Sequence, residues 1–265
     1  MFEMFDYPFM QRAFLAGLMI AVLASLGGSF IVLRRYSLLS ETLAHVSLVG
    51  VSVGILFGVS PLWMAVGASL LASWLIEYLR SEHGLYSDSI LAIFLSGSLA
   101  LAIVIVSLAG SFNASLFSYL FGSILSVTNE DLWVMGVFGT MAMALLLLFF
   151  KELYFIAFDE EVARASGIRV MFLNFMLVSI IAVIIALSIR VVGTLLIGAL
   201  MVIPPVAAIR FGMGFYPTTL LSVAIALVSV IAGLSASYVF SLPSGAAIVL
   251  FLLGIFVISL AVNRR

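Results

Sequence analysis

A carboxylate and an imidazole lie four residues apart near the start of an apolar stretch. In RRYSLLSETLAHVSLVG (34–50) they are Glu41 and His45. At positions i and i+4 of a helix, Cβ atoms are about 5–6 Å apart. Carboxylate oxygen and imidazole nitrogen together suit a divalent transition-metal ion. Ionisable residues inside membrane helices usually mark a route for an ion or substrate, so Glu41 and His45 are predicted to contact a metal ion in transit.

Each of the two residues also has a structural alternative. Glu41 could complement the helix dipole in a first turn capped by Ser37 or Ser40. His45 could be a buried imidazole satisfied by a neighbouring backbone carbonyl. If Arg34 marks the membrane interface, His45 lies on the order of 15 Å deeper at ~1.5 Å per residue, near the middle of a hydrocarbon core about 30 Å thick. This depth favours the ligand role more strongly for His45 than for Glu41.

The composition indicates that the whole chain is a polytopic membrane protein. Of its 265 residues, 65% are hydrophobic and 9% are charged, whereas a soluble domain carries about 25% charged residues. No cysteine is available for a disulfide or a thiolate metal ligand. A membrane-crossing helix needs about 20 mostly apolar residues. We therefore predict one all-helical domain with about nine spans, within a range of eight to ten, at about 13–33, 40–58, 62–79, 89–110, 131–150, 170–189, 191–209, 216–240 and 244–262.

The distribution of basic residues predicts the orientation of these spans. With nine crossings, one side of the membrane receives nine of the eleven basic residues, and cytoplasmic loops are the ones enriched in Lys and Arg. We therefore expect the N-terminus outside and the C-terminus inside. The basic-rich side holds Arg34, Arg35, Arg80, Lys151, Arg164, Arg169, Arg210, Arg264 and Arg265, and the other side holds Arg12 and Arg190.

Two segments are not read as spans. Residues 115–131 are only moderately apolar and are expected to form a short helix near the outer surface or re-entering the bundle. The stretch FDEEVARASGI (158–168) on the basic-rich side combines acidic residues with small ones. Small side chains allow another protein to approach closely, so this stretch is either a docking helix for a cytoplasmic partner or a solvated connector.

Other motifs restrict the chemistry. The sequence has one lysine, in FFKEL, and no GxxxxGK[ST] motif, so it binds no ATP through a P-loop. The absence of HExxH excludes a zinc intramembrane protease of that type. His83 lies in a charged turn and is expected to be solvated. Pro204 and Pro205 within the seventh span are expected to kink the helix.

Together these segments resemble the permease subunits of the zinc, manganese and iron ABC importers, a group that includes ZnuB, MntB and TroC. The resemblance rests on RRYSLLSETLAHVSLVGV, YLFGSIL, FDEEVARASGI, VGTLLIGALMVIPPVAA and LPSGAAIVL, in this order along nearly the whole chain. The sequence departs from the family pattern at Glu41, where aspartate is usual, at Ala44, where serine is usual, and in lacking the family's proline after His45.

The resemblance implies a multi-pass permease of a prokaryotic cell membrane that catalyses no reaction itself. It implies a homodimer with two cytoplasmic ATP-binding subunits and an external metal-binding protein, in a lipid bilayer and without nucleic acid. Zinc or manganese, with iron as a third candidate, would be transported cargo rather than a permanent cofactor. The coupling segment at about 158–168 would contact the ATPase through Asp159, Glu160, Glu161, Ala163, Gly167 and Ile168. Two alternatives stay open: a secondary carrier that uses no ATP, and an ABC permease for a metal chelate.

Overall fold

Helices make up nearly all of the chain that the structure, a computed structural model, describes: residues 6–83, 86–108, 114–123 and 127–262. No strand occurs within these ranges. Eight of the described helices are long and apolar enough to cross a membrane. The helices are α1 (Pro8–Leu33), α2 (Leu38–Phe57), α3 (Pro61–His83), α4 (Ser87–Leu108), α5 (Ala114–Phe121), α6 (Asn129–Leu148), α7 (Phe150–Phe158), α8 (Glu160–Ala165), α9 (Val170–Val192), α10 (Ile197–Ile209), α11 (Phe215–Phe240) and α12 (Ser244–Val262).

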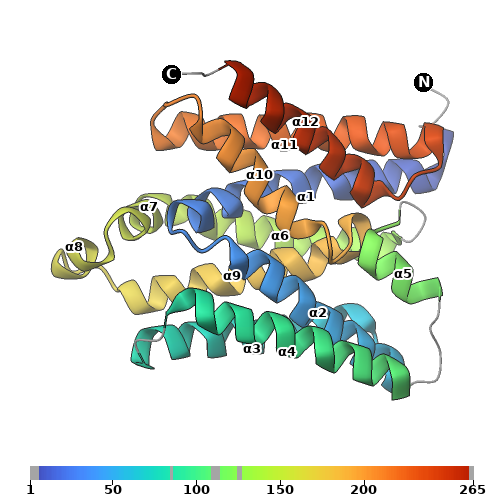
Figure 1. The fold of residues 1–265 in the computed structure, drawn as a ribbon, viewed down its shortest axis with the longest axis horizontal. Helices are drawn as coiled ribbons and strands as arrows, with labels where there is room; N and C mark the ends of the chain where they lie inside the picture. Colours follow the sequence, from blue (N-terminus) through green and yellow to red (C-terminus); the bar gives the residue numbers. More distant parts are fainter. Residues whose placement is uncertain (1–5, 84–85, 109–113, 124–126, 263–265) are drawn as a thin grey trace.

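The long helices form two groups joined by a central helix. Helices α1, α10, α11 and α12 pack together on one side, and α2, α3 and α4 on the other (Figure 1). Helix α9 contacts both α1 and α3 and lies between the groups. Its side chains are mostly buried, which explains why it is apolar on all faces rather than on one stripe.

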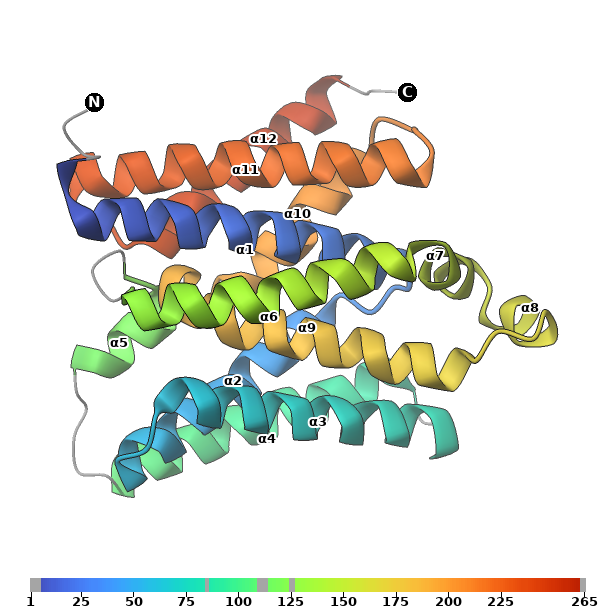
Figure 2. The same cartoon turned by 180° about the vertical axis from the view of Figure 1, so that it is seen from behind.

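The two ends of the bundle carry different short helices. Helices α7 and α8 project at the end where the C-terminal helix finishes, and α5 lies at the end where α1 begins (Figures 1 and 2). We call these the α8 end and the α5 end. Helix α1 begins and α12 finishes at opposite ends of the bundle, which fits an odd number of crossings. The short helix expected within 115–131 is present as α5. His83 is the last residue of α3.

The predicted boundary between the sixth and seventh spans was wrong. Arg190 was expected to separate them, but it lies in the last turn of α9, which continues to Val192. The chain breaks instead at Gly193, whose φ of +87° is readily adopted only by glycine. Helix α10 then has 13 residues, about 20 Å at ~1.5 Å per residue, so it is shorter than the eight helices that are long enough to cross a membrane.

The backbone groups released at this break are satisfied by segments distant in sequence. The amides of Thr194 and Leu195 donate to the carbonyls of Tyr119 (2.9 Å) and Leu120 (3.2 Å) at the end of α5. The Ser244 hydroxyl, at the start of α12, donates to the Val191 carbonyl at 2.8 Å. Irregular backbone at membrane depth is tolerated only when protein supplies such partners. Three of the sequence motifs therefore meet at one place, around the α9–α10 break.

Helix α10 contains both prolines of the VIPPV motif. Pro205 offers no amide to the carbonyl of Met201, four residues earlier. Gly28 of α1 lies directly against that carbonyl, because a Cβ placed on Gly28 would be 1.9 Å from the Met201 oxygen. The glycine thus lets α1 cover the backbone group that the proline leaves open.

Candidate metal path and docking helix

His45 lies in the interior of the protein on the third turn of α2. Its side chain is 6% exposed. Within the described ranges its Nδ1 atom is buried and has no hydrogen-bond partner. Buried polar groups are nearly always satisfied, so an exception needs an explanation. No carbonyl satisfies this nitrogen within the described ranges, so the alternative of a carbonyl-satisfied imidazole is not seen at Nδ1.

Glu41 lies one turn earlier and is exposed. It belongs to the first turn of α2, where Ser37 is the N-cap residue without a side-chain capping bond. Ser40 donates to the Ser37 carbonyl at 2.9 Å and does not cap the helix either. The carboxylate therefore supplements a first turn that has no side-chain cap, and it is also open to a ligand.

Helix α10 passes directly over the Glu41 turn. A Cβ placed on Gly198 would lie 3.6 Å from the Ser40 hydroxyl and 3.7 Å from the Cβ of Glu41. The helix that follows the α9–α10 break therefore lies close to the helix that carries both candidate ligands. A shift of α10 would change the surroundings of Glu41.

The hydroxyl groups near His45 differ from the imidazole because they have partners. Thr42 donates to the Leu91 carbonyl at 3.2 Å, and Ser47 shares a short hydrogen bond with Ser69 of α3. These bonds connect α2 to α4 and α3. Within the described ranges no three His, Cys, Asp or Glu side chains come close enough to hold a metal ion, so one chain offers at most Glu41 and His45.

A short helix, α8, lies within the stretch 158–168 that was expected to dock a partner, but it covers only Glu160–Ala165, and Phe158 belongs to α7. Asp159 caps its start by accepting the Val162 amide at 3.0 Å. Its end is a Schellman motif. The amide of Gly167 donates to the carbonyl of Arg164 (3.1 Å), and the amide of Ile168 donates to the carbonyl of Ala163 (3.2 Å). Gly167 has the left-handed conformation this motif requires, with φ of +83°.

The six residues expected to contact an ATPase do not share one face. Asp159, Glu161 and Gly167 are exposed and Ile168 is half-buried. Ala163 is fully buried and offers nothing to a partner in this conformation. The exposed face also carries two apolar side chains that the sequence reasoning did not single out, Phe158 at 74% and Val162 at 48% exposure.

Glu160 is turned towards the rest of the protein. Its Oε2 atom lies 3.4 Å from Arg34 and 3.3 Å from Arg80. Its Oε1 atom accepts from Asn174 at 3.4 Å and lies 3.5 Å from Arg164 on its own helix. One carboxylate of α8 therefore meets groups that belong to α3, to α9 and to the α1–α2 connection.

Two further residues complete this charged cluster. Glu77, only 1% exposed, binds Arg80 through two hydrogen bonds of 2.6 and 3.0 Å. Burial, and the charge of Arg80 beside it, lower the pKa of Arg34, and Glu77 and Glu160 oppose this shift. Burial, reinforced by Glu77, raises the pKa of Tyr36, which keeps its phenol neutral. The sequence signal that was overlooked is a carboxylate, Glu77, at the end of an apolar span.

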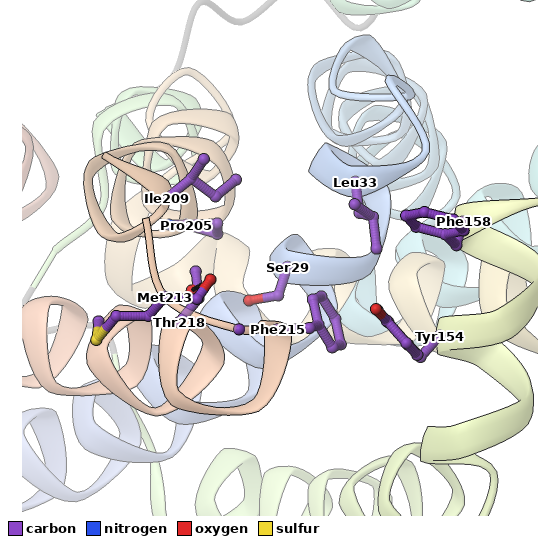
Figure 3. Close-up of a pocket in the computed structure, with 10 residues that line it drawn as sticks. Ser29, Leu33, Tyr154, Phe158, Pro205, Ile209, Met213, Phe215 and Thr218 are labelled. Carbon is purple, nitrogen blue, oxygen red and sulfur yellow. Dashed lines mark hydrogen bonds between the residues drawn. The ribbon is translucent and has the colours of Figure 1, made fainter. Parts of the chain in front are cut away.

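A separate cavity opens beside α7. It has a volume of about 310 Å³ and is lined by residues of α1, α7, α10 and α11, among them Tyr154, Phe158 and Pro205 (Figure 3). Its polar side chains include Ser29 and Thr218, which donate to the carbonyls of Ser25 and Met213. No charged group lines the cavity, so it does not suit a metal ion.

At the α5 end, Arg190 has a structural role that was not expected from its position between two apolar stretches. Its Nη1 atom lies 2.5 Å from Asp131 Oδ2, and its guanidinium lies 5.9 Å from the centre of the Tyr119 ring. Asp131 also closes a capping box with Thr128 at the start of α6. Arg190 therefore joins α9, just before the break, to α6 through the ion pair with Asp131 and to α5 through Tyr119.

Known proteins resemble this chain over nearly its full length. The profile of the ABC 3 transport family matches residues 6–263. A membrane protein of Treponema pallidum assigned to a metal transport system is 37% identical, over 91% of each chain. The manganese import system permease protein ScaB of Streptococcus gordonii is 33% identical, over 96% of this chain and 91% of its own.

Solved structures agree with the sequence comparison. A chain of PsaBC from Streptococcus pneumoniae, solved in complex with Fab, superposes with a TM-score of 0.86 and 30% identity, over 97% of this chain and 94% of that one. An inward-facing structure described as a metal-chelate type ABC transporter gives 0.70 at 20% identity, over 95% and 85% of the two chains, and shows the shared fold only. The chain therefore belongs to the ABC 3 transport family, as a multi-pass permease subunit of a prokaryotic plasma membrane.

Proposed function

We propose that this permease carries divalent transition-metal ions inward, with manganese or zinc as the first candidates and iron as the third. The observation that carries the proposal is His45, a buried imidazole whose Nδ1 atom has no partner in the described chain, one helical turn from the Glu41 carboxylate. The names of relatives support the same cargo, since ScaB and the Listeria monocytogenes protein MntC are described as manganese transport proteins.

The site requires a second source of ligands. Tetrahedral zinc sites use four ligands, and Glu41 and His45 supply two. We propose that two copies of the chain form a homodimer, in which two carboxylates and two imidazoles approach one another along a shared path. A transport site must also release its ion, and a site assembled from two subunits can weaken when they move apart.

The energy would come from a separate chain. We propose that α8 is the cytoplasmic coupling helix and that the exposed residues on and beside it contact an ATP-binding subunit: Phe158, Asp159, Glu161, Val162 and Gly167. Two such subunits would serve the homodimer, and an external metal-binding protein would deliver the ion. The exposed Phe158 and Val162 support this proposal, because apolar side chains on a projecting helix suit burial at a protein interface.

Metal uptake in a permease-deletion strain tests the cargo. His45→Ala should reduce manganese or zinc accumulation at limiting external metal at least tenfold, with unchanged membrane insertion and dimerisation. His83→Ala is the matched control, because it removes the chain's other histidine, and should leave accumulation within twofold of wild type. Normal accumulation by the His45 variant would contradict the metal role.

The two alternative functions give different results. A secondary carrier would transport metal without any co-purifying ATPase subunit. A chelate permease would take up the complexed metal and leave the free ion outside. The pairing of a carboxylate with an imidazole favours the bare ion, because both are direct metal ligands.

A further inference from the structure

Glu160 belongs to the docking helix but faces away from the surface that a partner would touch. Its contacts are with Arg34 (3.4 Å), Arg80 (3.3 Å) and Asn174 (3.4 Å). The next residue, Glu161, is exposed. Two adjacent carboxylates on one short helix thus have different environments. Of the two, Glu160 is the one that contacts side chains of other elements of the permease.

The groups that receive Glu160 are held in place without it. Arg80 is fixed by its two hydrogen bonds to the buried Glu77. Arg34 donates to the Oδ1 atom of Asn174 at 2.9 Å, and its side chain is 9% exposed. Glu160 is therefore the one member of the cluster that comes from the projecting six-residue helix. We call the three side chains that it contacts, Arg34, Arg80 and Asn174, the socket; they belong to the α1–α2 connection, α3 and α9.

One residue of this socket, Arg34, lies directly before α2, the helix that carries the candidate metal ligands. Arg34 caps α1, and α2 begins only four residues later, at Leu38. The connection between them is tight: Arg35 has a left-handed φ of +56°, and the Tyr36 amide donates back to Ile31 at 2.8 Å. Because the connection is short and hydrogen-bonded, a displacement of Arg34 should also displace the start of α2. Arg80 provides a second route, because α3 packs along α2.

We propose that Glu160 is a positioning residue that ties α8 to the beginning of α2, so that a movement imposed on α8 by the ATPase reaches Glu41 and His45. The proposal rests on the function proposed above. It assigns Glu160 a role inside the permease, in place of the partner contact that the sequence suggested. Glutamine has nearly the same size as glutamate but no negative charge, so Glu160→Gln would remove the ion pairs with Arg34 and Arg80 and leave weaker hydrogen bonds in which only the arginine is charged.

The first test needs only the permease in nanodiscs. Glu160→Gln should accelerate amide hydrogen exchange in residues 160–166 at least fivefold. Glu161→Gln makes the same chemical change at the neighbouring, exposed position and should leave exchange within twofold of wild type. Glu160→Asp keeps the charge and should restore part of the protection. Equal exchange in the wild type and Glu160→Gln would show that Glu160 does not anchor the helix.

The second test measures transmission in the assembled complex with its ATPase subunit. Trapping with ATP and vanadate should change exchange in residues 38–45 of the wild type. In Glu160→Gln this response should fall at least fivefold, while ATPase association and basal hydrolysis stay within twofold. A full response would overturn the proposal. A loss of ATPase association would also overturn it, because Glu160 would then be a docking residue.

The same experiment distinguishes the role proposed for Glu160 from the proposal that the permease transports manganese or zinc. A wild-type complex that responds to nucleotide at residues 38–45 but imports no manganese would refute the metal function and leave the role of Glu160 intact. A wild-type chain that binds no ATPase subunit would refute both.

Discussion

Glu41 carries one methylene more than the aspartate usual in the family that the sequence resembles. Because Glu41 is exposed in the first turn of α2, its longer side chain has room to reach a ligand beside His45. We expect Glu41→Asp to retain metal uptake within about threefold. Glu41→Gln removes the charge at the same length and should reduce uptake at limiting metal at least tenfold.

Helix-dipole stabilisation alone would give a different result. An acidic residue in a first turn typically contributes about 0.3–1 kcal/mol, so Glu41→Gln would slightly lower the melting temperature in detergent and leave uptake unchanged. Measuring uptake and melting on the same preparations distinguishes the two roles.

The sequence predicts contacts between residues that are close along the chain, and it does not predict contacts between residues that are far apart along the chain. Glu41 and His45 are four residues apart on one helix, and Gly167 follows a short helix where glycine commonly takes the left-handed conformation that it has here. The contact of Arg34 with Asn174 joins residues 140 positions apart. No local pattern indicates such a contact, and Glu160 was therefore assigned to a partner when its carboxylate faces the permease.

At the scale of elements, the end of α8 can be tested through Gly167. A Cβ there meets no atom within 4 Å, so any cost within the chain comes from the left-handed backbone, about 1–2 kcal/mol for most residues. Gly167→Asn should be nearly neutral, and Gly167→Ala should destabilise α8 by that amount. Gly167→Trp should in addition block an approaching ATPase.

Pull-down and ATP hydrolysis in nanodiscs, with the external binding protein supplied, check this prediction. We expect ATPase association to fall at least tenfold in Gly167→Trp and no more than about twofold in Gly167→Asn, with insertion and dimerisation unchanged in both. Full association of the tryptophan variant would mean that this loop is only a solvated connector.

The elements themselves were largely predictable, with one informative failure. Long apolar stretches identified the eight long helices and the small-residue segment identified α8. The α9–α10 boundary was misplaced because Arg190 was taken for a residue between spans, when it is paired with Asp131 inside the fold. Gly193 lies directly after α9 and was the better signal, but the backbone partners from α5 and α12 that stabilise the break cannot be inferred from the local sequence.

At the scale of the molecule, the orientation in the membrane remains a prediction from the nine-to-two distribution of basic residues. The chain has no cysteine, so single cysteines give a clean readout. Ser89→Cys, exposed in the first turn of α4, and Ser60→Cys, exposed in the α2–α3 connection, lie at opposite ends of the bundle. An impermeant thiol reagent applied to intact cells should label Ser60→Cys only.

The same distribution predicts that cysteines at Ser87 and Ser126 label from the inside and the outside respectively, and Ser126 lies outside the described residues. Labelling of Ser89→Cys alone would reverse the orientation, and α8 would then face away from any cytoplasmic ATPase. Labelling of both would mean that the number of crossings between them is wrong.

The way the α9–α10 break is satisfied has a consequence for the order in which the protein matures. The Val191 carbonyl receives its hydroxyl donor from Ser244, and the backbone of Val192 lies where a side chain on Gly245 would collide with it. Both partners leave the ribosome some fifty residues after the break itself. The α9–α10 break therefore cannot reach its final hydrogen bonding and packing until the last helix has been synthesised and has entered the bilayer.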